Sequence, residues 1–524
     1  MITKRTLLAA GLAAPAAVAS AQTQAQRSLR VIPQANLTSL DPIWTTAVIT
    51  RNHGFSVYDT LTSPNAAGVA QPQMAGWQVS DDRRLWRFTL RENLRFHDNE
   101  PVRSQDCLPS LRRWMARDSF GQVVATYVDG MDVLDDRRFA IRLKRPFAFL
   151  ADAVGRSQGP AFIMPERLAT TDPFTAVRDA TGSGPFRFVA GEWNPGVRAV
   201  YTRHDGYVPR QEPVDGLAGG KVPRVERMEW TVISDSATAA SAMTQNEQDY
   251  WEYPLHDLLP VLRRSRQVVV EQRLAEGTYG CLRFNHLHPP FNNPAIRRAV
   301  AMAVDQRDHL RAVAGEDPAG WATCDGVFNC GGPMENDQGS DILRIRSVDR
   351  ARAALRDAGY ANERVVVISP SDYPQINALG LVTVDLLRRI GMNVELIATD
   401  WGTVVQRRAS REPVERGGWS IFHTTAAGDA LMTPPIHLFL RSNGADAWFG
   451  WPDDPEIERL RAAWLDAPDE ATGKAIARQL NAQAMVSMPY VPLGYYWQPS
   501  AWNRRVTGAF KTPATVFWNM GKSA

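Results

Sequence analysis

The sequence predicts an α/β protein, and the clearest pattern of alternating strands and helices lies in the C-terminal half. RVVVIS (364–369) has the continuous apolar run of a buried strand, residues 374–390 show the apolar spacing of an amphipathic helix, and MNVELIA (392–398) is a second strand. Gly391 ends the helix. A strand, a helix and a strand in this order form a βαβ unit with parallel strands and a right-handed crossover. Alternating polarity at 85–96 predicts further strands.

The length of the chain predicts more than one domain. It has 524 residues, several times the size of a usual domain, and 44% of them are hydrophobic. Such a chain can bury more than one core, so we expect two or three domains. No internal repeat or low-complexity linker marks the boundaries between them.

Residues 1–21 are predicted to be a signal peptide. Lys4 and Arg5 precede an uncharged apolar run, and residues 19–21 have the small-x-small pattern of a signal-peptidase site, so the mature chain should begin at Gln22. The general and the twin-arginine export routes both stay open. A membrane anchor is the alternative, but it needs roughly 20 apolar residues. Because no Cys near the site can carry a lipid, we expect a soluble periplasmic protein without a lipid anchor.

LWRFTLRENLRF (85–96) predicts two short strands with a turn at Glu92-Asn93. In RFHDNEPVRSQDC (95–107), Asp98-Asn99 tolerates the positive φ of a tight turn, and residues 104–106 can cap the next helix. A metal site built from the His, Asp and Glu of this stretch is the alternative. Only one His is present, so we interpret the stretch as a turn that leads into a helix.

Further helices are predicted on either side of the βαβ unit. SVDRARAALRDAG begins after Ser347, a good N-cap, and ends at Gly359. The apolar spacing of residues 295–312 and 455–464 is also helical.

Four cysteines fall into two groups. Cys324 and Cys330 lie in the turn-rich stretch CDGVFNCGG, and export favours a disulfide between them. A zinc site is the alternative, but it needs two more ligands and only His309 is near. Cys107 and Cys281 lie in apolar segments, which is typical of small buried hydrophobic residues.

The sequence contains no motif of a known catalytic centre. It has no G-x-S-x-G, H-E-x-x-H, P-loop or paired C-x-x-C pattern, so we expect no catalytic residues, no metal and no cofactor. The net charge is +3 and falls by two when the signal peptide is removed, which does not favour nucleic-acid binding. The 16 tryptophans suit a protein that stacks against a ligand.

Several segments form an ordered series along the chain. They are Leu40-Asp41-Pro42, Tyr58-Asp59-Thr60-Leu61, Trp77 to Asp82, FTLRENLRFHDNEPVRSQD, Gly182 to Phe186, Asn285 to Pro290 with FNNPAIRRAVAMAVDQ, AALRDAGY and Pro489-Tyr-Val-Pro492. This series resembles extracellular solute-binding family 5, the solute-binding proteins of peptide and nickel ABC importers. Asn99 and Asn246 stand where that family commonly has Gly, and Asn is the next-best residue at positive φ.

The resemblance implies a two-lobed α/β clamshell of the three-domain, cluster C-like type with a discontinuous first domain. Domain I would comprise 28–55, 182–272 and 493–524, and domain II, 56–181, would extend the same lobe. Domain III, 273–492, would form the second lobe. The ligand would bind between two lobes that close by a hinge.

The resemblance also implies four ligand-binding residues. Trp401 matches an aromatic residue that lines the family's pocket, and Arg408 matches a position that can meet a carboxylate. Asp429 falls where peptide binders place an aspartate that pairs with the ligand's amino group, and His423 falls where some carry an arginine. We expect Trp44 to add a further aromatic surface. The usual aromatic three residues before Asp429 is absent here.

We therefore expect the periplasmic substrate-binding component of an ABC importer, which captures a small peptide or peptide-like solute and delivers it to permease subunits at the inner membrane. It should be a monomer and not an enzyme. A carrier of a nickel chelate, haem or another non-peptide solute is the first alternative, and His53, His286 or His423 facing the cleft would favour it. A secreted hydrolase is the second, and it needs Asp, Ser and His within hydrogen-bond reach in a cleft.

Overall fold

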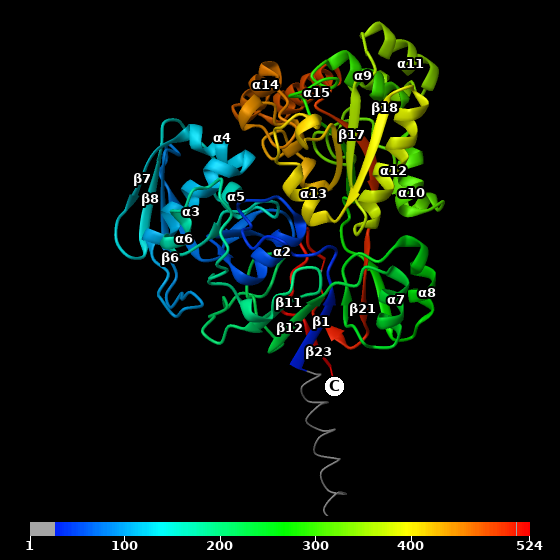
Figure 1. Ribbon diagram of the computed structural model, residues 1–524. Helices are drawn as coiled ribbons and strands as arrows, with labels where there is room; N and C mark the ends of the chain where they lie inside the picture. The colour runs from blue at the N-terminus through cyan, green and yellow to red at the C-terminus, as the bar shows by residue number, and fades with distance from the viewer. Residues whose placement is uncertain (1–26, 510, 524) are drawn as a thin grey trace, which may run out of the picture.

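The computed structural model describes residues 27–509 and 511–523 (Figure 1). The predicted signal peptide and its cleavage site lie outside these residues. Within them, no helix is both long and apolar enough to cross a membrane.

A seven-stranded sheet draws its strands from distant parts of the chain. Its order is β10-β11-β12-β1-β13-β21-β14, and β1 pairs parallel with both β12 and β13. The strands are β1 (Ser28–Ile32), β10 (Phe186–Phe188), β11 (Arg198–Arg203), β12 (Arg227–Thr231), β13 (Tyr250–Trp251), β14 (Val268–Gln272) and β21 (Pro499–Asn503). Helices α7 (Ser236–Thr244) and α8 (Leu259–Arg264) contact its β13 and β14 ends.

A four-stranded antiparallel sheet, β5-β6-β8-β7, lies beside α3 and α4 (Figure 1). Its strands are β5 (Ala75–Val79), β6 (Leu85–Leu90), β7 (Val128–Val133) and β8 (Arg138–Leu143). The helices of this region are α2 (Val48–Val57), α3 (Ser104–Arg117), α4 (Ser119–Tyr127), α5 (Leu150–Gly155) and α6 (Glu166–Ala169). Short pairs join β2 (Asp59–Thr60) to β9 (Phe162–Ile163), β3 (Thr62–Pro64) to β4 (Ala70–Pro72) and β22 (Val506–Thr507) to β23 (Gly521–Lys522).

A six-stranded mixed sheet, β16-β20-β15-β19-β17-β18, has its own core. Its strands are β15 (Thr278–Phe284), β16 (Trp321–Ala322), β17 (Arg364–Pro370), β18 (Asn393–Thr399), β19 (Ile421–Ala427) and β20 (Tyr490–Tyr496). The helices around it are α9 (Pro294–Ala303), α10 (Gln306–Ala314), α11 (Val348–Asp357), α12 (Pro374–Arg389), α13 (Trp401–Arg407), α14 (Pro455–Leu465) and α15 (Glu470–Ser487). Strands β17 and β18 are parallel and joined through α12, which confirms the predicted βαβ unit.

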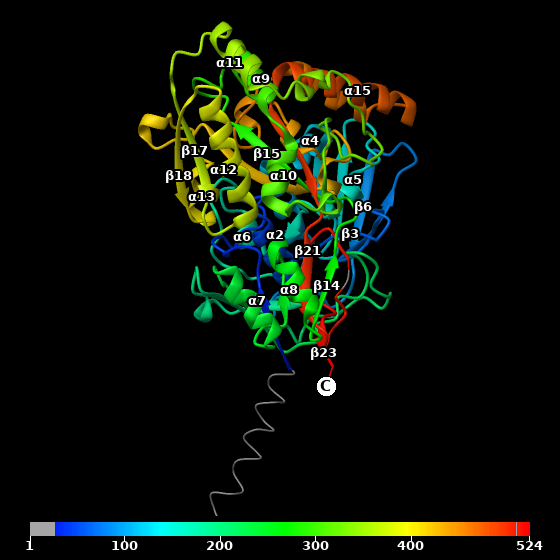
Figure 2. The same cartoon turned by 90° about the vertical axis from the view of Figure 1, so that its right-hand side faces the viewer.

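Two short connections join the six-stranded sheet to the rest of the molecule. Residues 273–277 lead from β14 to β15, and residues 497–498 lead from β20 back to β21. We call the part before residue 273 and after residue 498 the first lobe, and residues 278–496 the second lobe. Figures 1 and 2 show the second lobe packed against the first at one end. Two short crossings of this kind are what a hinge requires.

The domain bounds stay a proposal. We propose that the seven-stranded, four-stranded and six-stranded sheets mark domains I, II and III. Strand β20 continues to Tyr496, so the boundary placed after Pro492 falls inside a strand and fits the sheet better beyond residue 496.

Some sequence-based expectations differ from the structure in detail. Of the two strands predicted at 85–96, only Leu85–Leu90 forms, because after the turn at Asn93 (φ 60°) the chain makes a single bridge between Arg95 and Pro101. The helix predicted at 295–312 is two helices, since the side chain of Asp305 caps the second one. Asn99 (φ 70°) and Asn246 (φ 60°) have the positive φ expected of them, in the region where glycine is favoured.

Candidate ligand-binding cavity

A cavity of about 710 Å³ lies between the two lobes. The first lobe lines it with the loop and helix start at 42–51 and with the C-terminal half of α3. The second lobe lines it with α13, the end of β19 and the segment 445–451. A space of this size and position fits a small organic molecule.

Helix α13 brings Trp401 and Arg408 to the cavity wall. Asp400 caps the helix by accepting a hydrogen bond from the Thr403 amide at 2.9 Å. Trp401 is the first residue of the helix and Arg408 follows its last, so the two are seven positions, or about two turns, apart. They therefore share one face, and both line the cavity.

Arg408 is a buried cation inside a ring of aromatic side chains. Only 1% of the residue is exposed. Its Cζ lies 4.9–5.7 Å from the ring centroids of Trp401, Phe422, Trp448 and Phe449. This arrangement stabilises a guanidinium by cation–π attraction. Burial nevertheless lowers its pKa to about 9, because no described carboxylate pairs with it.

Thr46 connects the two lobes above this cage. Its Oγ1 lies 3.2 Å from Trp448 Nε1 and 3.4 Å from Arg408 Nη2. Both partners belong to the second lobe, whereas Thr46 belongs to the loop before α2. The first lobe therefore contacts the arginine cage directly.

Trp44 stands on the opposite wall, held by its own turn. The carboxylate of Asp41 accepts hydrogen bonds from the amides of Ile43 and Trp44, both at 3.0 Å, which is an Asx turn. The indole of Trp44 donates to the Phe174 carbonyl at 3.0 Å, and its own carbonyl accepts from Arg117 at 2.8 Å. Trp44, Arg117 and Phe174 all line the cavity.

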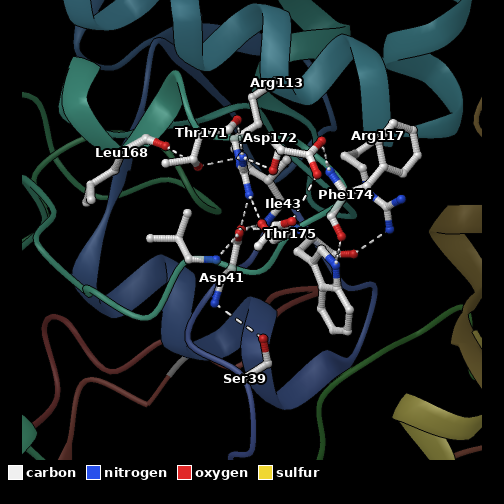
Figure 3. Close-up of polar contacts among 12 residues, drawn as sticks. Ser39, Asp41, Ile43, Arg113, Arg117, Leu168, Thr171, Asp172, Phe174 and Thr175 are labelled. Carbon is white, nitrogen blue, oxygen red and sulfur yellow. Dashed lines mark hydrogen bonds and ion pairs between the residues drawn. The ribbon is translucent and has the colours of Figure 1, made fainter.

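Arg113 holds this wall from behind (Figure 3). It forms a fully buried ion pair with Asp41 at 2.6 Å. Its remaining hydrogen bonds go to the loop at 171–175, where it donates to Thr171, Asp172 and Thr175 at 2.8–3.0 Å. A single side chain of α3 thus ties the turn that carries Trp44 to the loop that carries Phe174.

Asp429 is not among the residues that line the cavity. It lies at the contact between lobes, where it accepts hydrogen bonds from Ser157 Oγ and, at 3.4 Å, from Gln158 Nε2. Burial raises its pKa, and the bond from Ser157 opposes that shift. Its neighbours Ala427 and Ala430 do face the cavity.

His423 lies within the second lobe and also does not line the cavity. Its Nε2 is 2.8 Å from Thr383 Oγ1 on α12, and the same hydroxyl is 3.0 Å from His309 Nε2 on α10. Burial lowers the pKa of His423 to about 3 and that of His309 to about 4. Both rings are therefore neutral parts of the core at pH 7.

No histidine lines the cavity among the residues that the structure describes. His53 is buried against Tyr201, and His286 contacts the Pro489 carbonyl. No group of three or more His, Cys, Asp or Glu side chains in the described chain could hold a metal ion. The observation that would have favoured a nickel or haem carrier is therefore not found.

The disulfide loop supports the cavity from the second lobe. Cys324 and Cys330 are bonded, as predicted, with Cα atoms 6.0 Å apart. Within the loop the Asn329 amide donates to the Leu431 carbonyl at 3.2 Å, and Leu431 lines the cavity. Cys107 and Cys281 are free and buried, in agreement with the sequence.

The fold and the position of the cavity match a known family. The model of bacterial extracellular solute-binding proteins, family 5, matches residues 70–445. The probable peptide ABC transporter periplasmic-binding protein y4tO of Sinorhizobium fredii is 37% identical over 533 residues, which cover 100% of both chains. The chain belongs to this family.

Solved structures with the same fold confirm the two-lobed clamshell. DppA from Helicobacter pylori, in complex with the peptide STSA, superposes with a TM-score of 0.78 at 19% identity and covers 96% of this chain and 100% of that one. The PBP AgaA in complex with agropinic acid, from A. tumefacien R10, gives a TM-score of 0.78 at 20% identity, with 95% of this chain and 99% of that chain covered.

In this solute-binding protein the sequence missed several cavity residues. Gln34 and Arg51 line the floor from the first lobe, and Trp448 lies in the arginine cage. Ser157, the partner of Asp429, was also missed. None of these residues stands in a sequence motif.

Proposed function

We propose that this protein is the periplasmic substrate-binding component of an ABC importer and that it captures a small peptide or peptide-like solute. The observation that carries the proposal is the 710 Å³ cavity, which both lobes line and which contains an aromatic cage around a buried arginine. The name of the Sinorhizobium relative, a peptide-binding protein of an ABC transporter, supports the peptide class.

The proposed ligand contacts are Trp44, Trp401 and Arg408. The two indoles offer flat apolar surfaces on opposite lobes, and the guanidinium offers donors to an anionic end of the ligand. Asp429 takes a different part, since its oxygens are engaged with the first lobe, and we assign it to holding the lobes together. His423 is assigned to the core.

The proposed function also includes export, a monomeric state and delivery of the solute to a permease. The chain is exported with residues 1–21 as a signal peptide, carries no lipid anchor, works as a monomer and passes its solute to permease subunits at the inner membrane. It performs no chemistry on the solute, because capture and release need only closure and opening of the lobes.

Binding without turnover tests this function. Protein purified gently from the periplasm is denatured, and the released small molecules are identified by mass spectrometry. The identified solute is then returned to the protein in a calorimeter. We expect one solute per protein and a melting temperature that rises with solute concentration, because the solute binds the native form alone. Chemical conversion of the solute during the titration would contradict the proposal.

A further inference from the structure

The cavity wall contains buried hydrogen-bond donors that have no partner. Among the described lining residues, the buried side-chain atoms without a partner are Gln34 Nε2, Gln34 Oε1, Arg51 Nε, Arg117 Nε, Ser119 Oγ, Trp401 Nε1 and Arg408 Nε. Five of these atoms can only donate, and one, Gln34 Oε1, can only accept. A buried donor without a partner destabilises a protein, so such a wall suits a ligand rich in acceptors.

Among these residues, Arg408 has the most hydrogen-bonding capacity left unused. Its Nε has no partner, and its Nη2 has only the 3.4 Å contact with Thr46. No carboxylate in the described chain forms an ion pair with it, although it is almost fully buried. Buried charges in proteins are usually paired, and a guanidinium pairs best with a planar oxyanion. A carboxylate of the ligand would complete the site.

The charged residues of the cavity wall also favour an anionic ligand. The lining contains five arginines and two aspartates, namely Arg51, Arg117, Arg156, Arg408, Arg411, Asp118 and Asp446. Asp118 is already paired with Arg156 and caps α4, and Asp446 is exposed at the rim. No other acid in the described lining is available to a cationic ligand group.

Asp429, two residues beyond the lining residue Ala427, is engaged elsewhere. One of its oxygens accepts from Ser157 and the other from Gln158, both on the first lobe. Both carboxylate oxygens of Asp429 are therefore engaged by the first lobe, and the residue does not line the cavity. A buried ammonium without a carboxylate would be strongly disfavoured.

We propose that this cavity selects acidic solutes, with a carboxylate of the solute against Arg408 and no free ammonium group anywhere in it, as in a short acidic peptide whose amino end is acylated. This inference rests on the proposed function in that it needs a solute held between the lobes. It goes further by stating which charge that solute carries and which end of a peptide must be blocked.

A mixture of matched probes tests the charge rule. The mixture contains the dipeptide Ala-Glu, its N-acetyl form, the N-acetyl form with both carboxyls converted to amides, the dipeptide Ala-Lys, and two carboxylates that are not peptides, glutarate and gluconate. Protein freed of bound solute is incubated with equal amounts of all six and filtered, and the retained probes are quantified by mass spectrometry. We expect N-acetyl-Ala-Glu to be retained at least tenfold over Ala-Glu, and the amide and Ala-Lys to be lost.

Each other outcome has a distinct meaning. Preferential retention of Ala-Glu, Ala-Lys or the amide would overturn the inference and leave the peptide-binding function standing. Retention of glutarate or gluconate alone would support the charge rule and contradict the peptide class. If no probe is retained, both are contradicted.

Variants of two arginines in the second lobe separate a ligand role from a structural one. Arg408→Gln should abolish retention of N-acetyl-Ala-Glu, whereas the melting temperature of the ligand-free variant should stay equal or rise, because an unpaired buried charge has been removed. Arg416→Gln makes the same charge change at a side chain that is 71% exposed and should alter neither property. A fall in the melting temperature of ligand-free Arg408→Gln, or full retention of the probe, would overturn the inference.

Discussion

Asp41 and Arg113 form an ion pair of 2.6 Å between side chains that are completely buried, and the pair joins the turn before α2 to α3 (Figure 3). Arg113→Met leaves Asp41 charged and without its partner. Breaking a buried pair in this way lowers the free energy of unfolding by about 3–5 kcal/mol.

The measurement is the denaturant midpoint of the ligand-free protein. The matched control is Arg459→Met, which removes an exposed arginine paired with Glu456 and should cost about 1 kcal/mol or less. Equal losses in the two variants would show that the buried pair is not what holds this wall.

Trp44 should contribute affinity more than stability, because it is half-buried and lines the cavity. Trp44→Ala should weaken binding of the identified solute by about 1–2 kcal/mol, the range of an aromatic contact at a binding site. Trp464→Ala, which removes a half-buried indole on α14 away from the cavity, should leave affinity unchanged. Calorimetry measures the affinity of both variants for the solute. Equal affinities would show that Trp44 does not contact the solute.

The hydrogen bond from Ser157 to Asp429 should favour the closed form. Ser157→Ala removes one bond between lobes and should weaken solute binding by about 1 kcal/mol, mainly through faster release. Ser80→Ala removes a Ser–Asp hydrogen bond within the first lobe and should not affect release. Stopped-flow displacement measures both rates.

Asp429→Asn provides the discriminating comparison. As a lobe contact it should resemble Ser157→Ala in its effect on binding. A loss of 100-fold or more for Asp429→Asn beside a negligible loss for Ser157→Ala would instead show that the aspartate binds the solute directly.

Stability should fall as the pH falls below about 6.5. Burial lowers the pKa of eight histidines, which are His53, His97, His204, His256, His286, His309, His423 and His437. The unfolded chain then binds more protons than the native one between its own histidine pKa and the lowered values. Each such group lowers the free energy of unfolding as the pH falls through that interval.

Denaturant midpoints between pH 7.5 and pH 4.5 check this expectation. His423→Gln removes one of these groups and should make the curve shallower, since its pKa is lowered to about 3. His288→Gln replaces a half-buried histidine that is not one of the eight and serves as the matched control. A flat pH profile of the parent protein would contradict the explanation.

The disulfide between Cys324 and Cys330 should stabilise the second lobe. On the chain-entropy model, closing a loop of this length contributes about 2 kcal/mol, so Cys324→Ser with Cys330→Ser should lower the unfolding free energy by that amount. Thiol labelling of the native parent protein without reductant should find neither cysteine reactive. Labelling of both would show that the bond does not form in the protein as purified.

Local signals in the sequence determined much of the fold. The βαβ unit at 364–399 was readable because apolar spacing reports which face of an element is buried. The stretch RFHDNEPVRSQDC was readable as a turn and a helix start because Asn99 tolerates positive φ and the Asp106 side chain caps α3 by accepting from the Arg103 amide. The pairing of Cys324 with Cys330 spans six positions.

Only part of the site could be predicted from local patterns. Trp401 and Arg408 face the cavity together because they share one helix face, which the sequence spacing contains. From the sequence, His423 was expected to face the pocket. In the structure it points toward Thr383 instead, because α12 packs on β19.

The sequence by itself determined the α/β elements, the turns and the disulfide, because each depends on residues a few positions apart. Tertiary structure decided which charged side chains are paired within the protein and which are left for a ligand. Asp429 meets Ser157 across 272 positions, and Arg113 meets Asp41 across 72, so one acid is engaged between lobes and one arginine is neutralised. Arg408 is left buried with no carboxylate, because the packing of α13, β19 and the segment 445–451 within the second lobe surrounds it with rings instead of acids.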